Sequence, residues 1–181
     1  ACPTRRSSDL NSREVRGTDT DPANIVVTPG AKPIMFYGLL ALAEPGVEVI
    51  YPNPGFPIYE SMIKFAGATP VPMQLMEETG YHPDIDALPG LITDKTRLMI
   101  INSPENPCGS ALTKEELEKI AGIVMQHPGL YVMADEIYKD ILYTGDHYSI
   151  SSIPEMQERT IILDGFSKSY AMTGWRMGYG I

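Results

Sequence analysis

The sequence predicts an α/β fold in which a mainly parallel sheet carries helices on both faces. Short β-rich runs alternate with helical runs from residue 24 onward. The strand candidates are apolar throughout, which is typical of strands that are covered on both faces. Residues whose side chains can bind ligands or take part in catalysis follow directly after several of these strands. In such sheets ligands bind beyond the carboxyl ends of the strands.

The first half of the chain supplies three strand candidates and two helices. Residues 24–28 (NIVVT) and 48–51 (EVIY) read as strands, and an apolar helix is expected at 32–43. A second helix is expected near residues 57–66. Residues 69–72 (TPVP) read as a short strand, and because proline cannot donate to a strand ladder, this strand belongs at an edge of the sheet.

The second half begins with a short helical turn near residues 85–91 and a strong strand at 98–102 (LMIIN). Thr113 then caps a helix that runs to Met125, with Glu116 completing a capping box. Residues 130–135 and 160–164 complete the strands, and a further apolar strand starts at Gly180.

Composition places the chain among globular proteins and excludes several classes of partner. It has 181 residues, of which 43% are hydrophobic and 20% charged, with a net charge of -9. This charge disfavours nucleic acid and anionic membranes, and no apolar run reaches the roughly 20 residues of a membrane span. The two cysteines and three histidines are too scattered for a disulfide framework or a metal site. With no apolar leader at the start, we expect a reducing, cytoplasmic setting.

The extreme N-terminus looks foreign to the fold. Residues 3–10 resemble the translation of a sequencing adapter, so residues 1–10 are interpreted as a non-native tail, with a natural disordered tail as the alternative. Residues 11–23 are expected to be a disordered or helical remnant, and residues 24–181 to be the folded part.

A glycine-containing turn links the first strand to the first helix. Gly30, Ala31 and Lys32 lie where backbone N–H groups and the helix dipole can bind a phosphate. Many turns of this kind contain glycine without binding anything. The sequence lacks the GxGxxG and GxxxxGK[ST] patterns of dinucleotide and nucleoside-triphosphate sites.

Two rigid turns present candidate binding side chains. Phe56 lies in a proline-rich turn, PNPGFPIY, where it could stack on a flat heterocycle or serve as ordinary core. Tyr59 is presented by the same turn. Asn106 precedes Pro107 in NSPENPCG, where its amide could donate to a ligand oxygen, although such pairs are often only turns.

The strongest chemical signals follow the last two strands. Asp135 ends a buried strand, where a carboxylate needs a cation or several donors unless it merely caps the next turn. Lys168, able to form a Schiff base, stands eight residues before Arg176, able to grip a phosphate. An aldehyde cofactor with a phosphate and a ring nitrogen, pyridoxal phosphate, would use all three residues.

The motifs GAK, PNPGFPIY, NSPENPCG, ADEIY and SKSYAMTGWRMGY together resemble those of the class I and II aminotransferases, fold type I pyridoxal-phosphate enzymes. The resemblance spans residues 21–181 and implies an incomplete large domain of this fold. It implies a reaction between an L-amino acid and a 2-oxo acid, carried out by a homodimer.

The resemblance also implies a role for each site residue. Lys168 would bind the cofactor and move a proton, and Asp135 would keep the ring nitrogen protonated. Tyr138 and Asn106 would bind the phenolic oxygen, and Phe56 would stack on the ring. The phosphate would be bound by the turn residues, Ser167 and Arg176.

Two positions depart from the family pattern, and part of the protein is expected to be missing. Cys108 replaces a threonine, and Gly165 replaces a serine that binds phosphate, a role left to Ser167. Relatives of this family are about twice as long. The chain as given is therefore expected to be inactive, with residues 24–28 exposed as an apolar edge because their neighbouring strand is missing.

Three alternatives remain open on the sequence alone. Carbon–sulfur lyases, aminocyclopropane-carboxylate synthases and some decarboxylases share these cofactor motifs. The chain could instead be the aminotransferase-like sensor of a transcription regulator with an upstream helix-turn-helix. A silent remnant is the third, and the intact Lys168, Asp135, Tyr138 and Arg176 argue against it.

Overall fold

The computed structural model describes residues 16–181. The predictions for residues 1–10, and for residues 11–15 of the expected remnant, lie outside the described residues. The described part of that remnant, residues 16–23, packs onto the sheet with Arg16, Thr18 and Thr20 buried.

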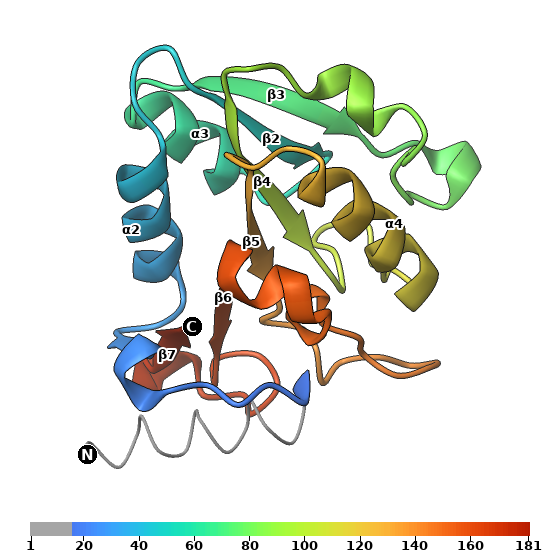
Figure 1. Cartoon of the computed structure of the whole chain (residues 1–181). Helices are drawn as coiled ribbons and strands as arrows, with labels where there is room; N and C mark the ends of the chain where they lie inside the picture. The colour runs from blue at the N-terminus through green and yellow to red at the C-terminus, as the bar shows by residue number, and fades with distance from the viewer. Residues whose placement is uncertain (1–15) are drawn as a thin grey trace.

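A single seven-stranded sheet forms the centre of the structure, with strand order β1-β7-β6-β5-β4-β2-β3 (Figure 1). The strands are β1 (Val26–Thr28), β2 (Glu48–Asn53), β3 (Thr69–Gln74), β4 (Thr96–Asn102), β5 (Tyr131–Asp135), β6 (Thr160–Gly165) and β7 (Gly178–Gly180). The α-helices are α2 (Lys32–Leu42), α3 (Ile58–Phe65) and α4 (Lys114–Met125). The 3-10 helices are η1 (Pro22–Asn24), η2 (Glu77–Thr79), η3 (Leu88–Leu91), η4 (Ile150–Ser152), η5 (Pro154–Arg159) and η6 (Thr173–Trp175).

Five neighbouring strands of the sheet are parallel to one another: β3, β2, β4, β5 and β6. Strand β7 runs antiparallel to both of its neighbours. The mainly parallel sheet predicted from the sequence is thus confirmed. Strand β3 contains Pro70 and Pro72 and lies at an edge of the sheet, as predicted. The N–H groups that these prolines lack are therefore not missing from the hydrogen bonds of a central strand. The capping box of Thr113 and Glu116 also forms as predicted.

Helices cover both faces of the sheet, as the apolar strands predicted (Figure 1). Alternate residues of β4 divide between the two layers: Leu98 and Ile100 pack with α2 and α3, whereas Met99 and Ile101 pack with α4. No helix in the described part of the chain combines the length and apolar character that a membrane span requires.

The expectation that residues 24–28 would lose their neighbouring strand is wrong. Strand β7 lies between β1 and β6, and Val26 pairs with Gly180. We expected an apolar strand to start only at Gly180. Strand β7 begins two residues earlier, at Gly178, and two of its three residues are glycine, which has low β-propensity.

Gly178 lets the turn after β1 lie directly on β7. A Cβ atom at this position would lie 2.3 Å from the carbonyl carbon of Gly30 and 2.4 Å from the backbone nitrogen of Ala31. Because both are backbone atoms, no side-chain rotation could relieve the contact. The small residue therefore fixes the position of the turn at the N-terminus of α2.

We expect Gly178→Ala to lower the free energy of unfolding by roughly 1–3 kcal/mol, the usual effect of overpacking. Gly122→Ala in α4 is the matched control, because its Cβ would meet no atom within 4 Å. This control should be neutral or stabilising by about 0.5–1 kcal/mol. Denaturant unfolding of both variants measures the difference, and equal stabilities would contradict the tight contact.

Candidate active site

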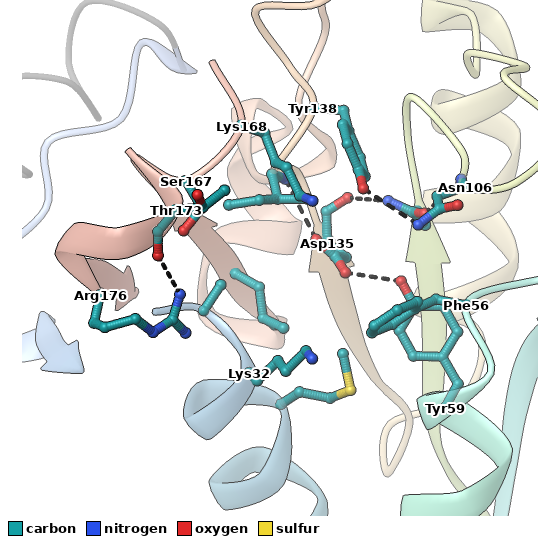
Figure 2. Close-up of a pocket in the computed structure, with 15 residues that line it drawn as sticks. Lys32, Phe56, Tyr59, Asn106, Asp135, Tyr138, Ser167, Lys168, Thr173 and Arg176 are labelled. Atoms are coloured by element: carbon teal, nitrogen blue, oxygen red, sulfur yellow. Dashed lines mark hydrogen bonds between the residues drawn. The ribbon is translucent and has the colours of Figure 1, made fainter. Parts of the chain in front are cut away.

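A cavity of about 260 Å³ opens beyond the carboxyl ends of β4, β5 and β6, next to the N-terminus of α2 (Figure 2). Nearly all of the site residues predicted from the sequence line it: Ala31, Lys32, Phe56, Asn106, Asp135, Tyr138, Ser167, Lys168 and Arg176. The remaining lining residues were not predicted as site residues: Met35, Tyr59, Asn102, Ile137, Leu163 and Thr173. Gly30, the other predicted residue, does not line the cavity.

Asp135 occupies the floor of this cavity at the end of β5 and is 7% exposed. Its Oδ2 accepts a hydrogen bond from the hydroxyl of Tyr59 at 2.8 Å, and its Oδ1 accepts one from the N–H of Ile137 at 3.3 Å. The second bond is the turn-capping contact that the sequence analysis offered as the alternative to ligand binding by Asp135. The two functions coexist because they use different oxygens.

Burial raises the pKa of Asp135 to about 6, because the charged carboxylate loses its water. The hydrogen bonds from Tyr59 and Ile137 oppose this shift, whereas the nearby Asp164 and Glu136 add to it. The carboxylate thus lies in a place where a cationic partner would stabilise it strongly.

Tyr59 is the main site residue whose role the sequence did not reveal. It lies one residue into α3 and is fully buried, and burial raises its pKa well above the usual value, so its hydroxyl remains a donor. Phe56 packs edge-on against the Tyr59 ring with 5.7 Å between centroids. The spacing of the two aromatics in PNPGFPIY was the available signal, but their contact partner is 76 residues away.

Tyr138 and Asn106 present two polar groups at the same wall of the cavity. The Asn106 amide donates to the Tyr138 hydroxyl at 3.2 Å. Asn102, at the end of β4, holds this wall in place: its oxygen accepts from the Asn106 N–H and its amide donates to the Asp135 carbonyl. The Nζ of Lys168 lies 5.6 Å from the centre of the Tyr138 ring.

Arg176 closes the opposite end of the cavity (Figure 2). Its guanidinium donates to the carbonyls of Thr173 at 2.8 Å and Pro29 at 3.2 Å. Gly30 makes room for this group, because a Cβ there would lie 2.3 Å from Arg176 Nη2, and its φ of 85° also suits glycine. Gly30 therefore shapes the site from behind its lining.

The cavity separates charge along its length. Arg176, the first residues of α2 and Ser167 lie toward one end, where cationic and N–H groups suit a phosphate. Lys168 lies between this end and Asp135. Such an arrangement can bind an elongated ligand with an anionic group at one end and a cationic nitrogen at the other.

The family model described as aminotransferase class I and II matches residues 8–181. Among curated relatives, an aspartate aminotransferase of Musicola paradisiaca is 46% identical over 157 residues, which are 86% of this chain and 39% of that protein. Aromatic-amino-acid aminotransferase 2 of Thermococcus litoralis is 41% identical over 165 residues, which are 90% of this chain and 42% of that protein.

Solved structures show the same likeness. The aromatic aminotransferase of Pyrococcus horikoshii has a TM-score of 0.93 and 42% identity, covering 97% of this chain and 48% of that one. The aspartate aminotransferase of Thermus thermophilus with maleate has a TM-score of 0.93 and 36% identity, covering 97% and 45%. The chain thus spans less than half the length of these relatives.

The raised pKa of Asp135 makes a prediction for the cofactor-free protein. Below the ordinary value of 3.8 the carboxyl is protonated in both the folded and the unfolded state, so its ionisation does not change the free energy of unfolding. Above about 6 it is ionised in both, and its burial lowers the free energy of unfolding by about 3 kcal/mol. Asp135→Asn should therefore stabilise the protein at pH 8 by up to that amount.

Denaturant unfolding between pH 4 and pH 8 measures this gain, which should shrink as the pH falls. Asp94→Asn, at an exposed position, controls for the loss of a charge. A variant that is no more stable than wild type at pH 8 would contradict the desolvated state of Asp135.

Proposed function

The chain belongs to the class I and II aminotransferase family, and we propose that the full-length protein transfers the amino group of an L-amino acid to a 2-oxo acid by means of pyridoxal phosphate. One observation carries the proposal: Lys168 and Asp135, from the ends of neighbouring strands, line the same cavity. Bound pyridoxal phosphate supplies an aldehyde that reacts with amines and a ring that absorbs the electrons of a broken bond at the substrate α-carbon.

The donor set fits this cofactor. The floor carries a buried carboxylate with a raised pKa, which a protonated ring nitrogen would stabilise. The far end carries Arg176 and the backbone N–H groups of Ala31 and Lys32, which suit the phosphate. We assign Ser167 to the same phosphate, since it lines the cavity in place of the serine expected at Gly165.

Each remaining side chain has a defined part in binding. Asp135 would accept a hydrogen bond from the ring nitrogen, while Tyr59 holds the carboxylate in orientation through its 2.8 Å bond. Tyr138 and Asn106, already bonded to each other, would donate to the phenolic oxygen. Phe56 offers its ring as the stacking face.

Lys168 is the residue that we assign to proton transfer. With the cofactor bound, Lys168 would hold it through Nζ, and as a free amine Nζ would act as the base that moves the proton of the substrate α-carbon. The Tyr138 ring, 5.6 Å from Nζ, would keep the amine at this wall of the cavity.

Among possible donors we propose an acidic amino acid. The ammonium of Lys32 extends into the cavity, 5.6 Å from the centre of the Phe56 ring (Figure 2). This leaves a cation beside the stacking face, where the second carboxylate of a dicarboxylic substrate would bind. Relatives named aspartate aminotransferase from Musicola paradisiaca and Pyrococcus abyssi support this choice.

We also propose that the full-length protein is a cytoplasmic homodimer. Three aromatic side chains are exposed, Tyr37 at 54%, Phe65 at 73% and Trp175 at 70%. We propose that the remainder of the polypeptide or a second subunit covers them. Cys108 is a free thiol, which suits a reducing compartment.

Lys168→Ala in the full-length protein should abolish both the visible absorbance of the bound cofactor and the transamination activity. The loss of turnover should be at least about a thousandfold, because the residue is both covalent anchor and proton carrier. Lys95→Ala, at an exposed position, is the matched control and should keep both properties. Retained turnover in the Lys168 variant would overturn the assignment.

Lys32→Met tests the donor class separately. It should lower kcat/KM for aspartate by about tenfold or more, the effect of losing one charge-assisted hydrogen bond, and leave kcat/KM for phenylalanine within a fewfold of wild type. Steady-state kinetics with both donors provide the measurement. Equal losses for the two donors would count against an acidic substrate.

A further inference from the structure

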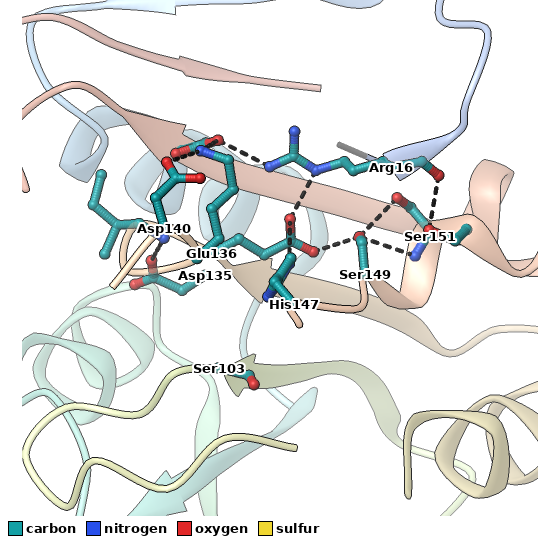
Figure 3. A network of polar contacts seen from close by, with 12 residues as sticks. Arg16, Ser103, Asp135, Glu136, Asp140, His147, Ser149 and Ser151 are labelled. Carbon is teal, nitrogen blue, oxygen red and sulfur yellow. Dashed lines mark hydrogen bonds and ion pairs between the residues drawn. The ribbon is translucent and has the colours of Figure 1, made fainter. Parts of the chain in front are cut away.

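A buried group of charged side chains lies behind Asp135, on the opposite face of β5 and β6 from the cavity (Figure 3). We call Arg16, Glu136, Lys139 and Asp164 the buried ion cluster. Each of these side chains is at most 4% exposed. The function proposed above gives none of them a role.

Arg16 connects the two acids of the cluster. Its Nε lies 2.7 Å from Glu136 Oε2, and its Nη2 lies 2.9 Å from Asp164 Oδ2. The side chain of Arg16 is fully buried, and its carbonyl accepts a hydrogen bond from Ser152. One guanidinium therefore binds the ends of two neighbouring strands at once.

Further donors contact both carboxylates. Asp164 Oδ2 also receives Lys139 Nζ at 2.9 Å and the Tyr179 hydroxyl at 2.6 Å. Glu136 Oε1 accepts from the Ser149 hydroxyl at 2.5 Å. Each buried carboxylate of the cluster is thus surrounded by hydrogen-bond donors and cations.

The cluster is adjacent in the chain to the site. Glu136 directly follows Asp135, and Asp164 directly follows Leu163, which lines the cavity. The Glu136 N–H donates to the Leu163 carbonyl at 2.9 Å, which fixes the two strand ends together. Since neighbouring strand residues point to opposite faces, the cluster and the cavity share the same short backbone segments.

We propose that Arg16 is a positioning residue for Asp135: its guanidinium balances Glu136 and Asp164 behind the cavity floor, and so keeps Asp135 ionised toward the cofactor. The inference rests on the proposed function. Three carboxylates at two strand ends, Asp135, Glu136 and Asp164, repel one another in a medium that screens poorly. Arg16 contacts two of them and leaves the third free to bind a cation.

The pKa directions agree with this balance. Burial pushes the pKa of Glu136 upward, but Arg16 and His147 outweigh burial and lower it to about 2. Glu136 and Asp164 both push the pKa of Asp135 upward, beyond the effect of burial. Losing Arg16 would leave these two charges less compensated, so Asp135 would take up a proton at higher pH.

Other described groups also bear on Asp135 from the elements around it. Tyr59 faces it from α3, and the cavity brings further cations and hydroxyls near it. These are Lys32, Tyr138, Lys168 and Arg176 on the cavity side, and Lys139, Asp140, His147 and Tyr179 on the cluster side. None of these residues is substituted in the variants below, so the variants differ in charge only at Arg16 and Glu136.

The experiment measures the dissociation constant of pyridoxal phosphate between pH 5.5 and pH 9 for full-length variants. Arg16→Met removes the charge and should weaken binding at pH 7.5 by at least about tenfold, with the loss of affinity on acidification starting at higher pH. Arg16→Lys keeps the charge and should retain most of the affinity. Arg16→Met with Glu136→Gln removes one charge of each sign and should recover affinity.

This recovery separates an electrostatic role from simple packing, because a second buried substitution would not repair a packing defect. Unchanged affinity in Arg16→Met, or no recovery in the double variant, would overturn the inference. Should the Arg16→Met variants fail to fold, Glu136→Gln alone decides. This variant should keep its affinity for pyridoxal phosphate down to a lower pH than wild type does. An unchanged pH dependence of the dissociation constant would overturn the inference.

The two proposals fail in different ways. A wild-type protein that binds no pyridoxal phosphate overturns the proposed function together with this inference. A wild type that binds the cofactor normally, with variants that match it at every pH, overturns only the role of Arg16.

Discussion

The burial of one carboxylate at the end of a central strand is the constraint around which the site is organised. Asp135 loses its water on burial, which raises its pKa to about 6, so the carboxyl favours a proton or a cationic partner. The Tyr59 hydroxyl and the Ile137 N–H stabilise it in the folded protein, and both of these donors are uncharged. A protonated ring nitrogen would stabilise this buried charge, so in the proposed function part of the affinity for the cofactor would come from the burial of Asp135.

Sheet topology brings the other groups to this carboxylate. Strands β4, β5 and β6 are parallel neighbours, so Asn106, Asp135 and Lys168 come from adjacent strand ends although the sequence separates them widely. The antiparallel strand β7 then returns the chain to the turn after β1. This return places Arg176 against Gly30 and Pro29, and thereby brings its guanidinium next to the turn before α2.

Local patterns in the sequence predicted most of the fold because each strand and helix carries its own signal. The proline-rich edge strand β3 and the capping box at Thr113 are examples. The motifs also predicted nine of the fifteen residues that line the cavity. The contacts of Tyr59 and Arg16 were not predictable in this way, because their partners lie 76 and 120 residues away. The start of strand β7 was placed two residues too late, at Gly180, for a different reason, since two of its three residues are glycine.

The protonation state of the cofactor's ring nitrogen in the full-length protein tests the central role of Asp135 most directly. Solid-state NMR of pyridoxal phosphate labelled with ¹⁵N at the ring would measure it at pH 8. We expect a protonated nitrogen in wild type and an unprotonated one in Asp135→Asn, because only the carboxylate stabilises the cationic ring. An unprotonated nitrogen in wild type, or equal spectra for the two proteins, would contradict this role.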